Sequence, residues 1–291
     1  MFASRLALVA CLCVALEAHA TEVAQNARPS VRRSYAGVPP RDAGTPDTGA
    51  DAGTPDSGVP PWSNTYSVLF DGADERAQST YAADMDGQTA VTISFWVKAP
   101  GGWDPSRMFA GKYASAGDRR VYGAWSLSSD KTRSDWYDQS DVSGLVISSN
   151  ASALGNWLVW HHWCGTWDTG GTNNKLWYDG VEIAITTSGT LPTSALKIDN
   201  VNGISVASLA GGANWFAGNV DELAIWNSVE SCNTIYGGAP QDLSALSTPP
   251  VHWYRMGDGD TAPTLLDSGS GTATSLTMYN MEAGDIEADV P

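Results

Sequence analysis

The stretch Trp215–Asn227, with the sequence WFAGNVDELAIWN, constrains the fold more than any other part of the chain. It reads as a turn followed by a strand: Gly218 breaks the pattern, and from Val220 onward two sets of residues alternate. Both sets contain apolar residues, so we expect both faces of the strand to be covered, as in the inner strands of a two-sheet sandwich. Asp221 lies among these apolar neighbours, and a buried carboxylate needs hydrogen-bond donors, a counter-charge or a metal.

The bulk composition favours one large domain. The chain has 291 residues, of which 42% are hydrophobic, and this suffices for a single all-β core. Sixteen lysines and arginines oppose 32 aspartates and glutamates, so the formal net charge is -16. Such a chain would repel phosphates, which excludes nucleic acid as a partner. The acidity serves either solubility or the binding of divalent cations, and the sequence leaves both open.

Residues 1–20 are predicted to form a secretory signal peptide. Arg5 supplies the charged start, Leu6–Leu16 the apolar run, and Ala18-His19-Ala20 the cleavage site. The run is too short to span a membrane. Leu8–Cys11 also resembles a bacterial lipoprotein box, but the apolar run continues past Cys11, which disfavours lipid anchoring there. We therefore predict a secreted or cell-surface protein.

Residues 21–61 are predicted to be a disordered linker. Pro, Gly, Ala, Asp and Thr dominate this segment, and Asp42–Ala50 is repeated nearly unchanged as Asp51–Val59. A tract of this kind cannot bury enough apolar surface to offset the entropy of ordering it. Residues 62–291 are left as the folded domain.

The folded part contains several further strand patterns. Val91–Lys98 alternates and is rich in β-branched and aromatic residues. Asp179-Gly180 between two apolar runs predicts a hairpin, in which Lys175–Tyr178 pairs with the segments before and after it. The other predicted strands are Ser67–Phe70, Met108–Tyr113, Ala124–Leu127, Leu145–Ser149 and Val251–Met256.

Four segments together resemble the laminin G-like, concanavalin A-like jelly-roll family. They are FDGADE at Phe70–Glu75, VTISFWVK at Val91–Lys98, the hairpin Trp157–Gly180, and FAGNVDELAIWN at Phe216–Asn227. The resemblance covers roughly residues 62–235. It implies an antiparallel two-sheet jelly-roll sandwich, which we expect Val251–Met256 to close, because too few residues follow for a separate core.

Catalysis has little support in the sequence. Sandwiches of this architecture include retaining glycoside hydrolases, which need two carboxylates facing one another about 5–5.5 Å apart. Asp221 and Glu222 are adjacent, and adjacent residues of a regular strand point to opposite faces, so we expect them not to form the pair. The same argument keeps His161 and His162 from sharing a metal, and we expect one in the core and one at the surface.

Calcium is the cofactor that the resemblance implies, since many family members hold one ion near a rim of the sandwich. Calcium prefers oxygen ligands. The expected side-chain ligands are Asp221 and, in the opening turn, Asp71, with the ion pinning that turn to the late strand. The alternative is that Asp221 only accepts backbone hydrogen bonds.

A sugar site is suggested by tryptophans outside the predicted strands. The chain has 13 tryptophans, and those within predicted strands are assigned to the core. Trp103, Trp136, Tyr137 and Trp215 lie in polar or Gly-rich segments, where exposed rings could stack on a sugar face. The alternative is that these rings cover the ends of the sandwich.

After removal of the leader, Cys164 and Cys232 are the remaining cysteines. They could form one disulfide in an oxidising compartment, but the sequence does not fix their separation. The resemblance does not settle the pairing, because related pentraxin-like proteins pair the cysteine equivalent to Cys164 with one in the strand where this chain has Ser94.

The resemblance thus implies a non-catalytic recognition module whose partners are most often glycans or other cell-surface proteins. A lectin-like carbohydrate binder is the first hypothesis. The second is a structural or adhesive domain that binds protein, and the third, a glycoside hydrolase, is disfavoured by the positions of its carboxylates. The fold by itself does not select among them, and the oligomeric state is left open.

Overall fold

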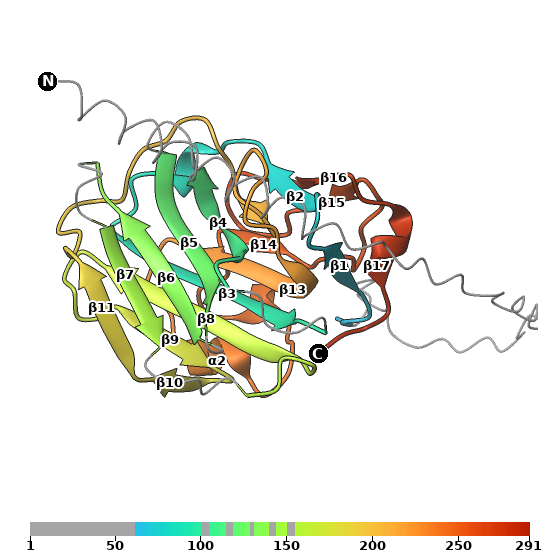
Figure 1. Cartoon of the computed structure of the whole chain (residues 1–291), viewed down its shortest axis with the longest axis horizontal. Coiled ribbons are helices and arrows are strands. Elements are labelled where there is room, and N and C mark those ends of the chain that lie inside the picture. Colours follow the sequence, from blue (N-terminus) through green and yellow to red (C-terminus); the bar gives the residue numbers. More distant parts are fainter. Residues whose placement is uncertain (1–61, 101–104, 115–118, 129–130, 140–143, 150–154) are drawn as a thin grey trace, which may run out of the picture. The chain divides into compact units, whose positions relative to one another are not determined.

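The computed structural model describes residues 62–100, 105–114, 119–128, 131–139, 144–149 and 155–291. Two antiparallel β-sheets pack face to face, which confirms the all-β, concanavalin A-like jelly-roll sandwich (Figure 1). The predicted signal peptide, the predicted linker and Trp103 lie outside the described residues. Within the described part, no helix is long and apolar enough to cross a bilayer.

Sheet A is built around β13 (Ala217–Trp226), which lies within the stretch Trp215–Asn227. β3 (Ala90–Lys98) pairs with one edge of β13, and β1 (Ser67–Asp71) and β14 share its other edge. β14 (His252–Tyr254) thereby joins the C-terminal segment to the same sheet. The other strands, in order across the sheet, are β10 (Val181–Ile183), β9 (Lys175–Tyr178), β8 (His161–Asp168), β3 (Ala90–Lys98), β13 (Ala217–Trp226), β1 (Ser67–Asp71) and β17 (Ile286–Glu287).

Sheet B lies against sheet A and contains the strands that carry the site described below. In order across the sheet, its described strands are β11 (Ile185–Gly189), β7 (Gly144–Ser149), β6 (Lys131–Tyr137), β5 (Arg119–Leu127), β4 (Met108–Ala114), β12 (Ser205–Val206), β2 (Arg76–Ser79), β16 (Leu276–Tyr279) and β15 (Thr264–Leu265).

Helical structure is confined, in the described part, to short segments. The α-helix α2 (Cys232–Tyr236) begins after Ser231, whose side chain accepts a hydrogen bond from the Thr234 backbone N–H, and it ends at Gly237 in the left-handed conformation. α2 lies on the outer face of sheet A. The 3-10 segments are η1 (Ala83–Met85), η2 (Leu243–Ala245) and η3 (Ala283–Asp285).

The main core fills the space between the two sheets. Alternate residues of the inner strands point into it, and its largest side chains are fully buried tryptophans and phenylalanines. The ring of Trp136 from sheet B stacks on Trp167 from sheet A at 6.1 Å between centroids, and Phe95 stacks on Trp163 at 5.0 Å. Large aromatic side chains of this kind contribute much of the area that stabilises a two-layer fold.

At one side of the sandwich, the connection between a strand of sheet A and the next strand, in sheet B, is only one residue long. β10 belongs to sheet A and ends at Ile183, whereas β11 belongs to sheet B and begins at Ile185. The chain therefore passes from one layer to the other at Ala184. Ile183 and Ile185 are partly buried and pack against the main core, which holds this crossing in place.

A buried charge network anchors β4. The Lys112 side chain is fully buried, and its Nζ lies 3.0 Å from Asp86 Oδ1 and 4.0 Å from Asp199 Oδ2. The same amine donates a hydrogen bond to the carbonyl of Asn202. Burial lowers the pKa of Lys112, and the two carboxylates act against that shift. Tyr113, the next residue of β4, points to the opposite side and forms part of the pocket described next.

Candidate functional site

A pocket opens on the outer face of sheet B, on the side away from the core. It has a volume of ≈ 360 Å³, within the range of small-molecule sites, and we call it the aromatic–arginine pocket. Its lining residues come from β4, β5, β6 and the loops beside them: Ser106, Tyr113, Arg120, Trp125, Arg133, Leu209 and Asn214.

Strand alternation on β6 places the charged residues of this pocket. Trp136 points into the core, so Arg133, Asp135 and Tyr137 point outward. The ladder with β5 sets Arg133 opposite Trp125 and Asp135 opposite Gly123. Gly123 is required here, because a Cβ at that position would lie 2.7 Å from the Trp125 indole nitrogen.

Two guanidinium groups rest on the aromatic side chains of the pocket. The Arg133 guanidinium lies 4.9 Å from the ring centre of Trp125, and that of Arg120 lies 4.8 Å from the ring of Tyr137. Tyr113 packs edge-on against Trp125 and Tyr137 with centroid distances of 5.0 and 5.9 Å. Cation–π contacts of this kind fix the orientation of the arginine side chains.

Asp135 lies beneath the guanidinium groups and is 1% exposed. Burial raises the pKa of its carboxyl to about 7, and Arg133 and Arg120 partly oppose this shift. Arg133 Nε lies 3.2 Å from Asp135 Oδ1. These two atoms form an ion pair, and among the described residues Asp135 Oδ2 and the Trp125 indole nitrogen have no hydrogen-bond partner.

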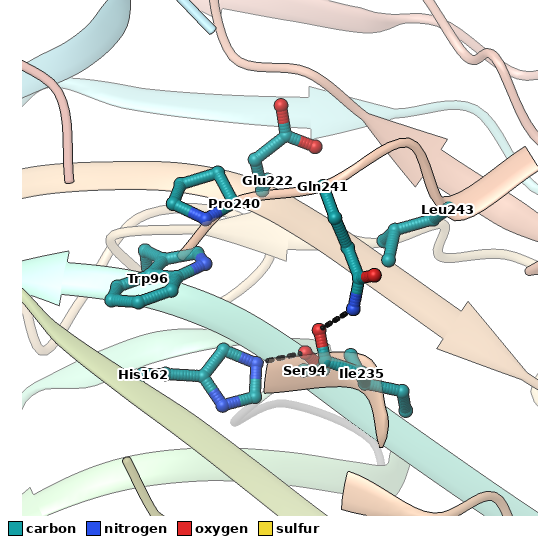
Figure 2. Close-up of a pocket in the computed structure, with 8 residues that line it drawn as sticks. All are labelled: Ser94, Trp96, His162, Glu222, Ile235, Pro240, Gln241 and Leu243. Carbon is teal, nitrogen blue, oxygen red and sulfur yellow. Dashed lines mark hydrogen bonds between the residues drawn. The ribbon is translucent and has the colours of Figure 1, made fainter. Parts of the chain in front are cut away.

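A second, smaller pocket lies on the outer face of sheet A, beneath α2. Figure 2 shows the residues that line it: Ser94, Trp96, His162, Glu222, Ile235, Pro240, Gln241 and Leu243. Ser94 Oγ and His162 Nε2 are 2.8 Å apart, and the Gln241 amide donates to the Ile235 carbonyl at 2.7 Å (Figure 2). Burial lowers the pKa of His162 to about 3, so its imidazole is neutral at physiological pH.

Glu222 reaches this second pocket because β13 contains a β-bulge. The register with β3 shifts between Asp221 and Ala224, and Glu222 is the extra residue, with a φ of 50°. Asp221 lies opposite Trp96, whose side chain is on the outer face. The bulge therefore puts both Asp221 and Glu222 on that face, and the prediction that they point to opposite faces is wrong.

Both carboxylates of the bulge are buried and hydrogen-bonded. The Asn64 amide donates to Asp221 at 2.9 Å, and the Trp253 indole donates to Glu222 at 2.5 Å. Arg255 Nε lies 3.5 Å from Glu222. Burial, together with the charge of Glu222, raises the pKa of Asp221 well above its usual value. Burial also raises the pKa of Glu222, to about 7.

Residues 71–235, more than half of the sequence, match the concanavalin A-like lectin/glucanases superfamily. The chain belongs to this superfamily. No curated protein sequence matches it.

Three solved structures are similar to this chain at low sequence identity. A candidate carbohydrate-binding protein from Bacteroides ovatus is 13% identical with a TM-score of 0.55, and the match covers 78% of this chain and 62% of that protein. The CBM40 module of the Ruminococcus gnavus IT-sialidase, bound to α2,3-sialyllactose, is 14% identical over 59% of this chain and 95% of that one, with a TM-score of 0.44. Domains LG4-5 of the mouse laminin α1 chain are 13% identical over 58% and 43%, with a TM-score of 0.39.

The predicted exposure of Trp136 and Tyr137 is wrong. Both residues belong to β6, which pairs with β5 and β7 within this concanavalin A-like sandwich. Trp136 is fully buried between the sheets and cannot stack on a sugar, and Tyr137 is 9% exposed beneath Arg120. Tyr137 thus supports the pocket from below.

Trp215 lies beside the aromatic–arginine pocket without lining it. It is partly buried and follows Asn214, which does line the pocket, and the Arg76 guanidinium lies 5.8 Å from its ring centre. Trp103 is outside the described residues. Of the four predicted sugar-binding aromatics, the structure therefore brings Trp215 and Tyr137 to the neighbourhood of one site.

The two predicted calcium ligands do not meet. Asp71 pairs with Ala217 in the β1–β13 ladder, and Asp221 lies four residues further along β13, about 13 Å away at ~3.3 Å per residue. Ligand oxygens lie within 2.6 Å of a calcium ion, so one ion cannot join both. Asp71 instead accepts a hydrogen bond from the Ala73 backbone at 2.7 Å. In the described residues, no three or more His, Cys, Asp or Glu side chains form a metal-binding group.

The structure joins Cys164 to Cys232 in a disulfide. Cys164 lies on β8 and Cys232 is the first residue of α2, so the bond ties the helix to the outer face of sheet A. Both sulfur-bearing side chains are fully buried in a small apolar cluster with Trp226 and Trp253.

Sequence reasoning missed the residues that form the aromatic–arginine pocket. The signal was present on β6, where Arg133, Asp135 and Tyr137 occupy alternate positions and give one face two charges and an aromatic ring. The partners Tyr113, Arg120 and Trp125 come from other strands, and only the ladder brings them together.

The buried carboxyls make the stability of the protein depend on pH. The pKa values of Glu222, Asp135 and Glu75 are each raised to about 7, so the folded state holds these protons more tightly than the unfolded chain. The lowered pKa of His162 acts in the opposite direction, but it is one group against three, so we expect the free energy of unfolding to rise as the pH falls from 8 to 5. Below about pH 4 the trend reverses, because the pKa values of Asp267 and Asp289 are lowered.

Glu222→Gln isolates one part of this effect. It removes the charge that Asp221, Asp258 and Arg255 face, and we expect it to stabilise the protein at pH 8 by on the order of 1–3 kcal/mol, with little change at pH 5. Urea unfolding at pH 5, 6, 7 and 8 measures both effects. A wild-type stability that falls between pH 8 and pH 5 would contradict the assignment of raised pKa values.

Proposed function

We propose that this protein is a secreted, non-catalytic recognition module that binds glycans through the aromatic–arginine pocket. The single observation that carries the proposal is this pocket, in which the polar atoms of Arg120 and Arg133 lie next to aromatic rings. Sugars offer many hydroxyl groups that can satisfy such atoms, together with apolar ring faces that pack on aromatic side chains. The candidate carbohydrate-binding protein that shares the fold supports the same class of ligand.

A non-catalytic role is supported by the placement of the carboxylates. Asp221 and Glu222 are 0% and 3% exposed and adjacent on one bulge, rather than facing one another across an open cleft. Glu222 is held by Trp253 and Arg255 and lines only the smaller pocket beneath α2. Retaining glycoside hydrolysis needs two carboxyls on either side of an accessible sugar bond. We therefore propose that these acids have no catalytic role.

A glycan array tests the proposal directly. We expect the full chain to bind a restricted set of glycans, and we expect Arg133→Ala to weaken that binding by about tenfold or more, because it removes one wall of the pocket. Lys175→Ala is the control, since Lys175 is a half-exposed cation on sheet A, away from the pocket. Thermal melting of both variants checks that they fold.

The array is run in Ca²⁺ and in EGTA. Binding that survives EGTA would assign recognition to the protein side chains alone, and binding that requires Ca²⁺ would make a metal part of the site. Retention of no glycan in either condition would overturn the proposal and favour the alternative, an adhesive domain that binds protein.

A further inference from the structure

We propose that the aromatic–arginine pocket selects anionic sugars, those that carry a carboxylate or a sulfate group. The inference rests on the proposed function and specifies the ligand class of the same site.

The first support is the fixed presentation of two guanidinium groups. Arg133 is held on Trp125 and Arg120 on Tyr137, at 4.9 and 4.8 Å. A guanidinium presents its N–H donors as a planar fork that matches the oxygens of carboxylate and of related oxyanions. Because the rings orient both side chains beforehand, a ligand anion would spend less entropy in ordering them.

The second support is the charge of the pocket. Tyr113 lines it from β4, Arg120 from β5 and Arg133 from β6, and Asp135 and Tyr137 of β6 lie behind these side chains. Burial raises the pKa of Tyr113 further above its already high value, so this phenol stays neutral. Among the described residues, two arginines and one carboxyl thus meet at the pocket, whereas the whole chain carries a net charge of -16. A local positive site in an acidic protein favours anions over neutral ligands.

The third support is the position of Asp135. It is buried behind the pocket lining, where Arg133 Nε is 3.2 Å from its Oδ1 atom. A ligand anion that binds Arg133 competes with Asp135 for the same cation. When Asp135 takes up a proton, that competition ends and the arginine is available to the ligand.

Competition with Asp135 predicts pH-dependent binding. Since burial raises the pKa of Asp135 to about 7, the carboxyl changes from mostly charged to mostly neutral between pH 8 and pH 6. If an anionic sugar binds only when Asp135 is neutral, the affinity for that sugar should rise by up to about tenfold as the pH falls from 8 to 6. Asp135→Asn should bind at pH 8 as tightly as the wild type does at pH 6, and should show no pH dependence in this range.

The test compares matched glycans on the full chain. An array carries neutral saccharides beside counterparts that contain uronic acid, sialic acid or sulfate, and titration calorimetry then follows the best acidic glycan and its neutral counterpart at pH 6 and pH 8. We expect the acidic member to bind at least about tenfold more tightly. Arg133→Gln should remove most of that preference, Arg133→Lys should keep part of it, and Lys175→Gln, the charge-matched control on sheet A, should leave it unchanged.

The outcomes separate this inference from the proposed function. Equal affinity for acidic and neutral counterparts, or a preference that Arg133→Gln leaves intact, overturns the anionic preference while glycan binding stands. Retention of no glycan overturns both. A preference confined to carboxylated or to sulfated glycans supports the inference and names the anion. Chemical denaturation of each variant separates loss of binding from loss of fold.

Discussion

Replacing Cys164 and Cys232 together with alanine should lower the free energy of unfolding by about 4 kcal/mol. The disulfide closes a loop with a sequence separation of 68, and the loss of this cross-link enlarges the conformational freedom of the unfolded chain. Alanine is preferred over serine because both positions are fully buried, and a hydroxyl group there would lack a partner. Equilibrium unfolding in urea gives the value.

The same variant should loosen α2 before it unfolds the sandwich. α2 has five residues, too few to be stable in isolation, and it is tied to β8 by the disulfide and by the apolar contacts of Ile235. We expect faster hydrogen exchange in residues 232–243 of the variant than in β3 and β13. Wild-type protein unfolded in the presence of a reductant should match the variant. A stability change below about 1 kcal/mol would contradict the entropic argument.

Lys112→Met should destabilise the protein by about 3–5 kcal/mol. Methionine fills a similar volume, but the change leaves Asp86 and Asp199 without the buried cation that lies 3.0 and 4.0 Å from them. Both carboxylates are nearly inaccessible, so water cannot replace the lost charge. Asp86 accepts hydrogen bonds from the backbone of residues 199 and 200, and we expect this loop to detach from β4 first.

A double variant separates lost charge from lost packing. Lys112→Met with Asp86→Asn removes one of the stranded charges, and we expect it to be more stable than Lys112→Met alone. The deficit of Lys112→Met should also shrink at lower pH, where the carboxylates can be protonated. An equal deficit at pH 5 and pH 8 would show that the loss is one of packing. The glycan affinity of the variant reports whether Tyr113, which follows Lys112 on β4, keeps its place in the pocket.

The sandwich could be predicted because its central strands carry strong local signals. Val91–Lys98 and the Asp179-Gly180 hairpin show the period and turn chemistry of strands, and both are strands where expected. β6 lacked such a signal. Thr132 and Ser134 point inward but are polar, and Arg133 and Asp135 point outward and are charged, so the segment read as a loop. A strand that carries functional charges on one face loses the alternation that identifies strands.

The site could be predicted less well, because it depends on contacts between distant segments. The bulge at Glu222 is an extra residue only relative to β3, and the pattern from Val220 to Trp226 looks regular without that partner. The aromatic–arginine pocket likewise combines residues between Ser106 and Asn214 from several strands. Tryptophan content pointed to aromatic side chains, but it could not distinguish the buried Trp136 from a ring beside an opening.

The passage of the chain between the sheets at Ala184 places two edge strands side by side, and edge strands decide whether copies of a β-protein pair with one another at high concentration. The strands that end the two sheets are short: β10 has three residues, β11 five, and β15 and β17 two each. Unpaired strand edges are the usual templates for edge-to-edge aggregation and amyloid-like stacking. Here the longest of them, β11, has five residues, mainly exposed Thr, Ser and Gly, and it follows directly on β10 of the other sheet. Short, polar edges of this kind offer a neighbouring copy little backbone to pair with.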